Sequence, residues 1–140
     1  TRGSLHKNEN TDFINREILQ ATAEMYLGGH DPCDPLVSPL YGDLQGLPPL
    51  LVQVGSAELL YDDGRRIAHN ARRAGVDVQF DVYPDMVHVF QFMYLIEPKS
   101  RRAVHAAARF ARKHWGEGYG AKSPKPIAKP IAEQVRQRVS

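Results

Sequence analysis

The chain has 140 residues, of which 42% are apolar, 24% are charged and one is a cysteine, and its formal net charge is +2. This length suits one small domain, and the small net charge gives no indication of a nucleic-acid or acidic-membrane partner. A single cysteine excludes an internal disulfide framework; with no leader pattern and no apolar run of about 20 residues, we expect a soluble, cytoplasmic protein.

The first predicted helix covers residues 12–27, where apolar residues recur at helical spacing. Thr11 or Asp12 is the expected N-cap, and a pair of glycines stops the helix. Residues 1–11 are polar and lack periodicity, as a loop entered in its middle would be. Residues 30–49 contain five prolines, which predicts a stiff loop of the kind that often borders a site.

A strand, a helix and a second strand are predicted next. Residues 50–54 are aliphatic apart from one glutamine, which predicts a short strand covered on both faces. Residues 62–74 place apolar side chains on one helical face and arginines on the other, with Gly75 as the stop. Residues 76–82 alternate apolar and polar side chains, which indicates one buried face on a strand at or near a sheet edge.

A proline at the first helical position opens the last predicted helix, residues 98–115. Its expected apolar stripe consists of Val104, Ala107, Ala108, Ala111 and Trp115. From residue 116 the composition changes to Gly, Pro, Lys and Ser, with five basic and two acidic residues. We expect a flexible linker over 116–130 and a short exposed helix over 131–139. The chain is thus divided into residues 1–115 and a basic tail, residues 116–140.

The order strand, helix, strand implies a right-handed crossover between parallel strands. Two strands are too few for a stable parallel sheet, because such sheets pair several strands and cover both faces. We therefore expect an α/β fold that is the C-terminal part of a larger, doubly wound and mostly parallel sheet, containing its last two strands and the flanking helices.

One acid and one histidine follow the two predicted strands. Glu58 comes after the first strand and His88 after the second. Active groups of open α/β sheets collect beyond the carboxyl ends of the strands, and a carboxylate can orient an imidazole that acts as a base. On position alone the alternative stays open that Glu58 is a turn acid and His88 a loop histidine bonded to backbone.

Five motifs occur in a characteristic order between residues 23 and 115. They are DPLVSPL at 34–40, LPP at 47–49, VGSAELLYDD at 54–63, AGVDV at 74–78 and YPDMVHVF at 83–90. Together they resemble the C-terminal part of the hormone-sensitive-lipase-like carboxylesterases, which are α/β-hydrolases. A set of motifs in the right order is far more specific than any one of them.

The resemblance implies a Ser-His-acid triad acting on small carboxylic esters, with no metal or organic cofactor. His88 matches the family's histidine, and Glu58 matches its acid, with Asp62 as the alternative acid. Asp62 and Asp63 are better explained as N-cap and first-turn acids of the helix that follows. The resemblance also makes the last helix and last strand possible surfaces of a homodimer.

The sequence departs from the family in its nucleophile. Neither a G-x-S-x-G elbow nor an H-G-G-G oxyanion segment occurs in the 140 residues, and Ser56, between Gly55 and Ala57, is only a partial match. We expect the serine in a missing N-terminal part and this fragment alone to be inactive. The alternative is a catalytically inactive, truncated hydrolase remnant that acts as an interaction module. A flavodoxin-like binding domain is disfavoured because no glycine-rich phosphate loop follows either strand.

Overall fold

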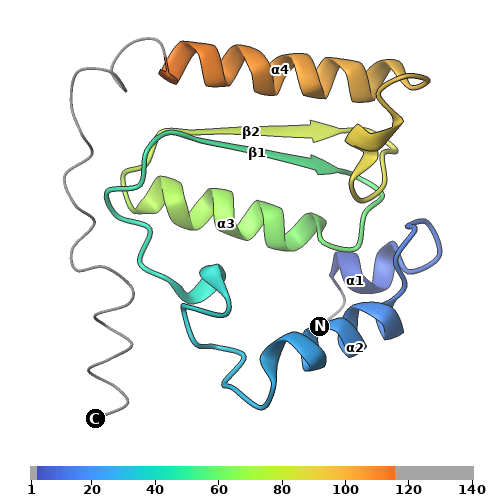
Figure 1. Ribbon diagram of the computed structural model, residues 1–140, viewed down its shortest axis with the longest axis vertical. Coiled ribbons are helices and arrows are strands. Elements are labelled where there is room, and N and C mark those ends of the chain that lie inside the picture. Colours follow the sequence, from blue (N-terminus) through green and yellow to red (C-terminus); the bar gives the residue numbers. More distant parts are fainter. Residues whose placement is uncertain (1–2, 116–140) are drawn as a thin grey trace. The chain divides into compact units, whose positions relative to one another are not determined.

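A computed structural model describes residues 3–115, so the linker predicted over 116–130 and the helix predicted over 131–139 lie outside the described residues. The chain divides into two units, residues 1–107 and 108–140, and the contacts described below belong to the first. The elements are α1 (Ser4–Lys7), α2 (Arg16–Leu27), the 3-10 helix η1 (Pro39–Tyr41), β1 (Leu50–Gly55), α3 (Tyr61–Arg73), β2 (Val78–Tyr83), the 3-10 helix η2 (Phe90–Met93) and α4 (Pro98–Trp115) (Figure 1).

The two strands form a parallel pair, with Leu50 opposite Val78 and Gly55 opposite Tyr83. Helix α3 makes the crossover between them and lies on one side of the sheet, while the first turns of α4 lie on the other (Figure 1). This arrangement confirms the predicted parallel α/β fold with helices on both faces. Because both strands run the same way, the loops that follow them emerge at the same end of the sheet.

Small side chains allow α3 to approach the sheet closely. Ala68 and Ala71 are fully buried on its inner face, and Ala71 packs with Leu44 and Val76. A Cβ built on Gly64 would collide with the Val54 side chain, so the first turns of α3 require glycine there. The predicted inner face and the left-handed Gly75 after the helix (φ 83°) are both confirmed.

On the other face of the sheet, Phe90 and Ala103 are fully buried and pack with Met86. Gln53, the one polar residue of β1, donates from Nε2 to the Ala103 carbonyl (2.9 Å) and so ties the sheet to α4. The stripe predicted for α4 omitted Ala103 and Ser100, both fully buried. The helix meets this cluster through small residues in its first turns, which let the backbones approach closely.

Two predicted helix starts were wrong. Helix α2 begins four residues later than expected, and its N-cap is Asn15, whose side chain accepts from the Ile18 amide at 2.8 Å. Helix α3 begins at Tyr61 without a side-chain cap, so Asp62 and Asp63 both lie in its first turn. The positive end of the helix dipole stabilises the negative charge of such acids. In each case the predicted capping aspartate has bonds elsewhere, described below.

Burial of the strands is lower than predicted. The first four residues of β1 are only half-buried, and Val82, expected on the buried face of β2, is 40% exposed. The physical reason is that only two strands are paired in the described residues, so the sheet faces are partly covered. No helix within residues 3–115 is long and apolar enough to cross a membrane.

Candidate active site

Glu58 and His88 lie together beyond the carboxyl ends of β1 and β2. Oε2 of Glu58 is 3.7 Å from Nδ1 of His88, within ion-pair range and longer than a hydrogen bond. The Glu58 side chain is 7% exposed and that of His88 is 32% exposed. The carboxylate is therefore inside the protein, while the imidazole can still be reached from outside.

The two loops that carry this pair are bonded to each other. We call residues 56–60 the acid loop and residues 84–89 the histidine loop. The Ser56 amide donates to the Tyr83 carbonyl (2.9 Å), and the Ala57 amide donates to the Met86 carbonyl (3.0 Å). The Ser56 hydroxyl accepts from the Asp85 amide at 2.8 Å, which gives this serine a structural place between the loops.

The histidine loop is anchored on both sides of His88. Met86 is 5% exposed and Phe90 is 1% exposed, so both side chains are buried. The Ser100 hydroxyl of α4 donates to the Phe90 carbonyl at 2.6 Å. Between these anchors Val89 has φ 49°, a left-handed conformation that is unfavourable for a β-branched residue. Backbone strain of this kind persists only where the surroundings enforce it, and it clusters at functional sites.

A polar segment near the N-terminus holds the acid loop. We call residues 4–12 the N-terminal strap. Asn8 donates to the carbonyls of Glu58 (2.8 Å) and Ser56 (3.1 Å), and Thr11 donates to that of Ala57 (2.9 Å). These residues were not predicted as part of the site, because side-chain bonds to a distant backbone leave no periodicity in the sequence. The signal present was the concentration of Ser, Asn, Thr and Asp, which commonly bond to backbone groups.

Asp12 was predicted as a helix cap and instead contacts both loops. Its Oδ2 accepts from the Leu59 amide at 2.8 Å, and its Oδ1 accepts from the His88 amide at 2.9 Å. This explains why α2 begins later than predicted, since the carboxylate is occupied away from the helix end.

Burial raises the pKa of the Glu58 carboxyl above its ordinary value of 4.5, because desolvation disfavours the charged form. A backbone hydrogen bond from Gly55 and the neighbouring His88 imidazole oppose this effect, and the Asp12 carboxylate adds to it. The carboxylate next to His88 is therefore ionised less readily than a solvated glutamate.

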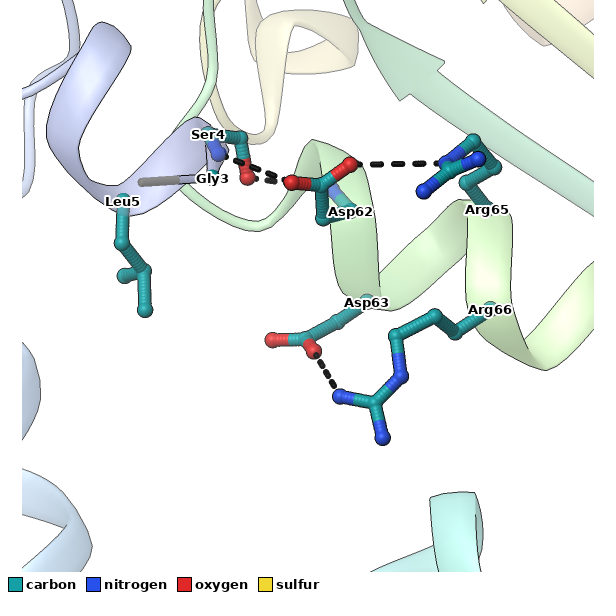
Figure 2. Close-up of a pocket in the computed structure, with 7 residues that line it drawn as sticks. All are labelled: Gly3, Ser4, Leu5, Asp62, Asp63, Arg65 and Arg66. Atoms are coloured by element: carbon teal, nitrogen blue, oxygen red, sulfur yellow. Dashed lines mark hydrogen bonds and ion pairs between the residues drawn. The ribbon is translucent and has the colours of Figure 1, made fainter. Parts of the chain in front are cut away.

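Asp62, the alternative acid, is engaged elsewhere. Figure 2 shows its carboxylate between the Ser4 amide (2.8 Å) and the Arg65 guanidinium (3.4 Å). Asp62 and Arg65 line a pocket of about 530 Å³. In the same pocket Asp63 pairs with Arg66 at 3.6 Å. The structure thus pairs His88 with Glu58. Within residues 3–115, no three His, Cys, Asp or Glu side chains gather as metal ligands would.

A family model described as the alpha/beta hydrolase fold matches residues 1–92. The chain belongs to the α/β-hydrolase fold family. Among curated proteins, this α/β-hydrolase is 49% identical over 106 residues to an acetyl-hydrolase of Streptomyces hygroscopicus, a match that covers 76% of this chain and 36% of the relative. It is 43% identical over 113 residues to an esterase of Acinetobacter venetianus, covering 79% and 37% respectively.

Solved structures agree with these relatives. An esterase from the bacterial hormone-sensitive lipase family is similar with a TM-score of 0.76 and 46% identity, over 79% of this chain and 38% of that one. The resemblance to hormone-sensitive-lipase-like esterases is thereby confirmed. Since the matches cover 36–38% of the relatives' lengths, the α/β-hydrolase chain spans little more than a third of the proteins it resembles.

Proposed function

We propose that this α/β-hydrolase chain supplies the general base, His88, and its orienting acid, Glu58, to an esterase that hydrolyses small carboxylic esters through an acyl-enzyme. The observation that carries the proposal is the 3.7 Å approach of Glu58 Oε2 to His88 Nδ1 across two mutually bonded loops. The relatives are named as an acetyl-hydrolase and an esterase, which supports the substrate class.

In this proposal each ring nitrogen of His88 has its own task. Nδ1 faces Glu58, so Nε2 is left to take the proton from a serine hydroxyl as the serine oxygen attacks the ester carbonyl. The imidazolium then gives that proton to the leaving alkoxide oxygen, and a water molecule hydrolyses the acyl-enzyme by the same steps. Glu58 holds the ring in the required tautomer and stabilises its positive charge.

The serine and the oxyanion donors of this proposal belong to a segment outside these 140 residues, since no G-x-S-x-G elbow occurs within them. The 32% exposure of the His88 side chain leaves its ring open to such a segment. A positioned imidazole without a nucleophile and oxyanion donors accelerates ester hydrolysis little. We therefore expect the 140-residue chain by itself to be nearly inactive.

The test is hydrolysis of p-nitrophenyl acetate by three proteins. These are the chain itself, the chain with the longest in-frame N-terminal extension that its coding sequence provides, and a chimera of the Streptomyces acetyl-hydrolase whose matching residues are replaced by this chain. We expect activity in the last two, reduced about 10⁶-fold by His88→Ala and about 10⁴-fold by Glu58→Gln. His69→Ala, at an exposed position on α3, is the matched control and should keep its activity.

Activity that is indifferent to His88→Ala would overturn the assignment of the base. A chimera and an extended chain that fold, by circular dichroism, but hydrolyse no ester would favour the inactive remnant instead.

A further inference from the structure

The Asp12 carboxylate joins the acid loop to the histidine loop. Its two oxygens accept from the backbone amides of Leu59 (2.8 Å) and His88 (2.9 Å). Leu59 directly follows Glu58, and the second amide belongs to the residue that bears the imidazole. One side chain therefore fixes the backbone next to both members of the pair.

The hydrogen bonds to Asp12 lie at other positions along the two loops than the bonds that join the loops directly. The direct bonds of the acid loop to the end of β2 and to the histidine loop start at Ser56 and Ala57 and reach Tyr83, Asp85 and Met86. The bonds to Asp12 lie further along both loops, at Leu59 and His88. The acid loop is therefore bonded both before Glu58, at Ser56 and Ala57, and after it, at Leu59.

Asp12 is itself held in place. The Phe13 amide donates to its Oδ1 at 2.8 Å. The side chain is half-buried, with three N–H groups directed at its two oxygens. Its orientation is therefore fixed before any substrate arrives, which is what precise positioning requires.

A carboxylate suits this place better than an amide. Both of its oxygens accept, whereas asparagine would have to turn its NH₂ group toward an N–H donor on one side. Hydrogen bonds to an ionised acceptor are also shorter and stronger than those to a neutral one. The negative charge has a cost, because it adds to the raised pKa of the Glu58 carboxyl. The three N–H groups that point at the Asp12 carboxylate stabilise its charge.

We infer that Asp12 is a positioning residue, which sets the separation of Glu58 and His88 and the direction of the imidazole without touching the substrate. Its effect on catalysis rests on the proposed function; its effect on the two loops does not.

The first measurement is made on the extended chain or the chimera and is independent of activity. Hydrogen–deuterium exchange and ¹⁵N chemical shifts are compared between wild type and Asp12→Asn, with Asp12→Ser as a second variant in case asparagine strains the site. We expect the Leu59 and His88 amides to exchange at least about tenfold faster and the His88 ring shifts to change. Loss of the hydrogen bonds to Asp12 lowers the free energy of local opening at these amides. The amides of Ala68 and Ala71 in α3 should stay unchanged.

Two control variants separate Asp12 from its surroundings. Asp43→Asn alters an aspartate that accepts a local hydrogen bond from the Gln45 amide at 2.9 Å, and it should leave both loops unchanged. Thr11→Val removes a bond between the N-terminal strap and the acid loop but keeps Asp12. It should leave the His88 amide and ring close to wild type.

The second measurement is steady-state kinetics of the extended chain or the chimera. Asp12→Asn is expected to lower kcat by about 100-fold with KM changed less than about twofold, since misplacing a base affects the reaction more than substrate binding. If the parent protein is inactive, the proposed function fails, and the exchange data alone still decide the role of Asp12.

Two results would overturn the inference. One is an Asp12→Asn variant whose His88 ring shifts and amide exchange equal those of wild type. The other is equally accelerated exchange at Ala68, Ala71, Leu59 and His88, which would show that Asp12 stabilises the fold as a whole.

Discussion

Gly55, the last residue of β1, lies directly against the carbonyl of Met86 in the histidine loop, so closely that a Cβ at position 55 would overlap this carbonyl. The acid loop can therefore leave the strand only if residue 55 has no side chain. The same carbonyl accepts from the Ala57 amide at 3.0 Å. Close approach at Gly55 and hydrogen bonding at Ala57 together bring the two loops into register.

Gly55→Ala is accordingly expected to destabilise the chain by about 3 kcal/mol, because the added methyl group meets backbone that cannot move aside easily. Chemical denaturation measures the change. Gly46→Ala is the matched control, since open space surrounds Gly46 and only its left-handed φ of 78° is penalised. It should cost about 1 kcal/mol. Equal losses for the two variants would contradict the steric explanation.

The raised pKa of Glu58 predicts how stability depends on pH. Between pH 4.5 and the higher pKa of the folded protein, the folded state binds more protons than the unfolded state, so the free energy of unfolding falls as pH rises. Glu58→Gln carries no such charge and should be more stable than wild type at pH 7, with the difference shrinking toward pH 4.5.

Thermal unfolding of both proteins from pH 4 to pH 8 checks this prediction. Glu17→Gln, at an exposed position in α2, should follow the wild-type curve. A Glu58→Gln variant that loses stability relative to wild type as pH rises would show that the sign is wrong.

The anchoring of the histidine loop by Phe90 predicts a large difference between two nearby phenylalanines. Phe90 is 1% exposed and Phe92 is 88% exposed. Phe90→Ala should cost about 3–5 kcal/mol in unfolding free energy, as truncation of a buried aromatic leaves a cavity, and it should also broaden the His88 ring signals. Phe92→Ala should change the unfolding free energy by less than about 0.5 kcal/mol. A similar cost at both positions would rule out the anchoring role.

Substitution of Asn8 tests how much the N-terminal strap stabilises the acid loop. It is 5% exposed and donates to the Glu58 and Ser56 carbonyls, so Asn8→Ala should cost about 1–3 kcal/mol by leaving these acceptors short of a donor. Asn10→Ala, on an exposed residue of the same segment, is the control. Urea denaturation of the two variants gives the comparison. If they unfold at the same midpoint, the strap contributes nothing to the stability of the loop.

The sequence by itself determined the parallel strand pair, the inner face of α3 and the placing of Glu58 and His88 after successive strands. These features follow from patterns within a few residues: alternation, helical spacing and glycine stops. Glu58 and His88 could be predicted to lie close together because parallel strands end at one edge of a sheet.

Only the tertiary structure decided how the pair is held. Asp12 sits where a helix cap is expected, and its local pattern gave no reason to look for partners 47 and 76 residues away, at Leu59 and His88. Asn8 likewise bonds across 50 residues to Glu58. Such bonds depend on where the folded backbone leaves unpaired N–H and C=O groups. No periodicity along the chain encodes that, because these groups come together only after the strands and helices have packed.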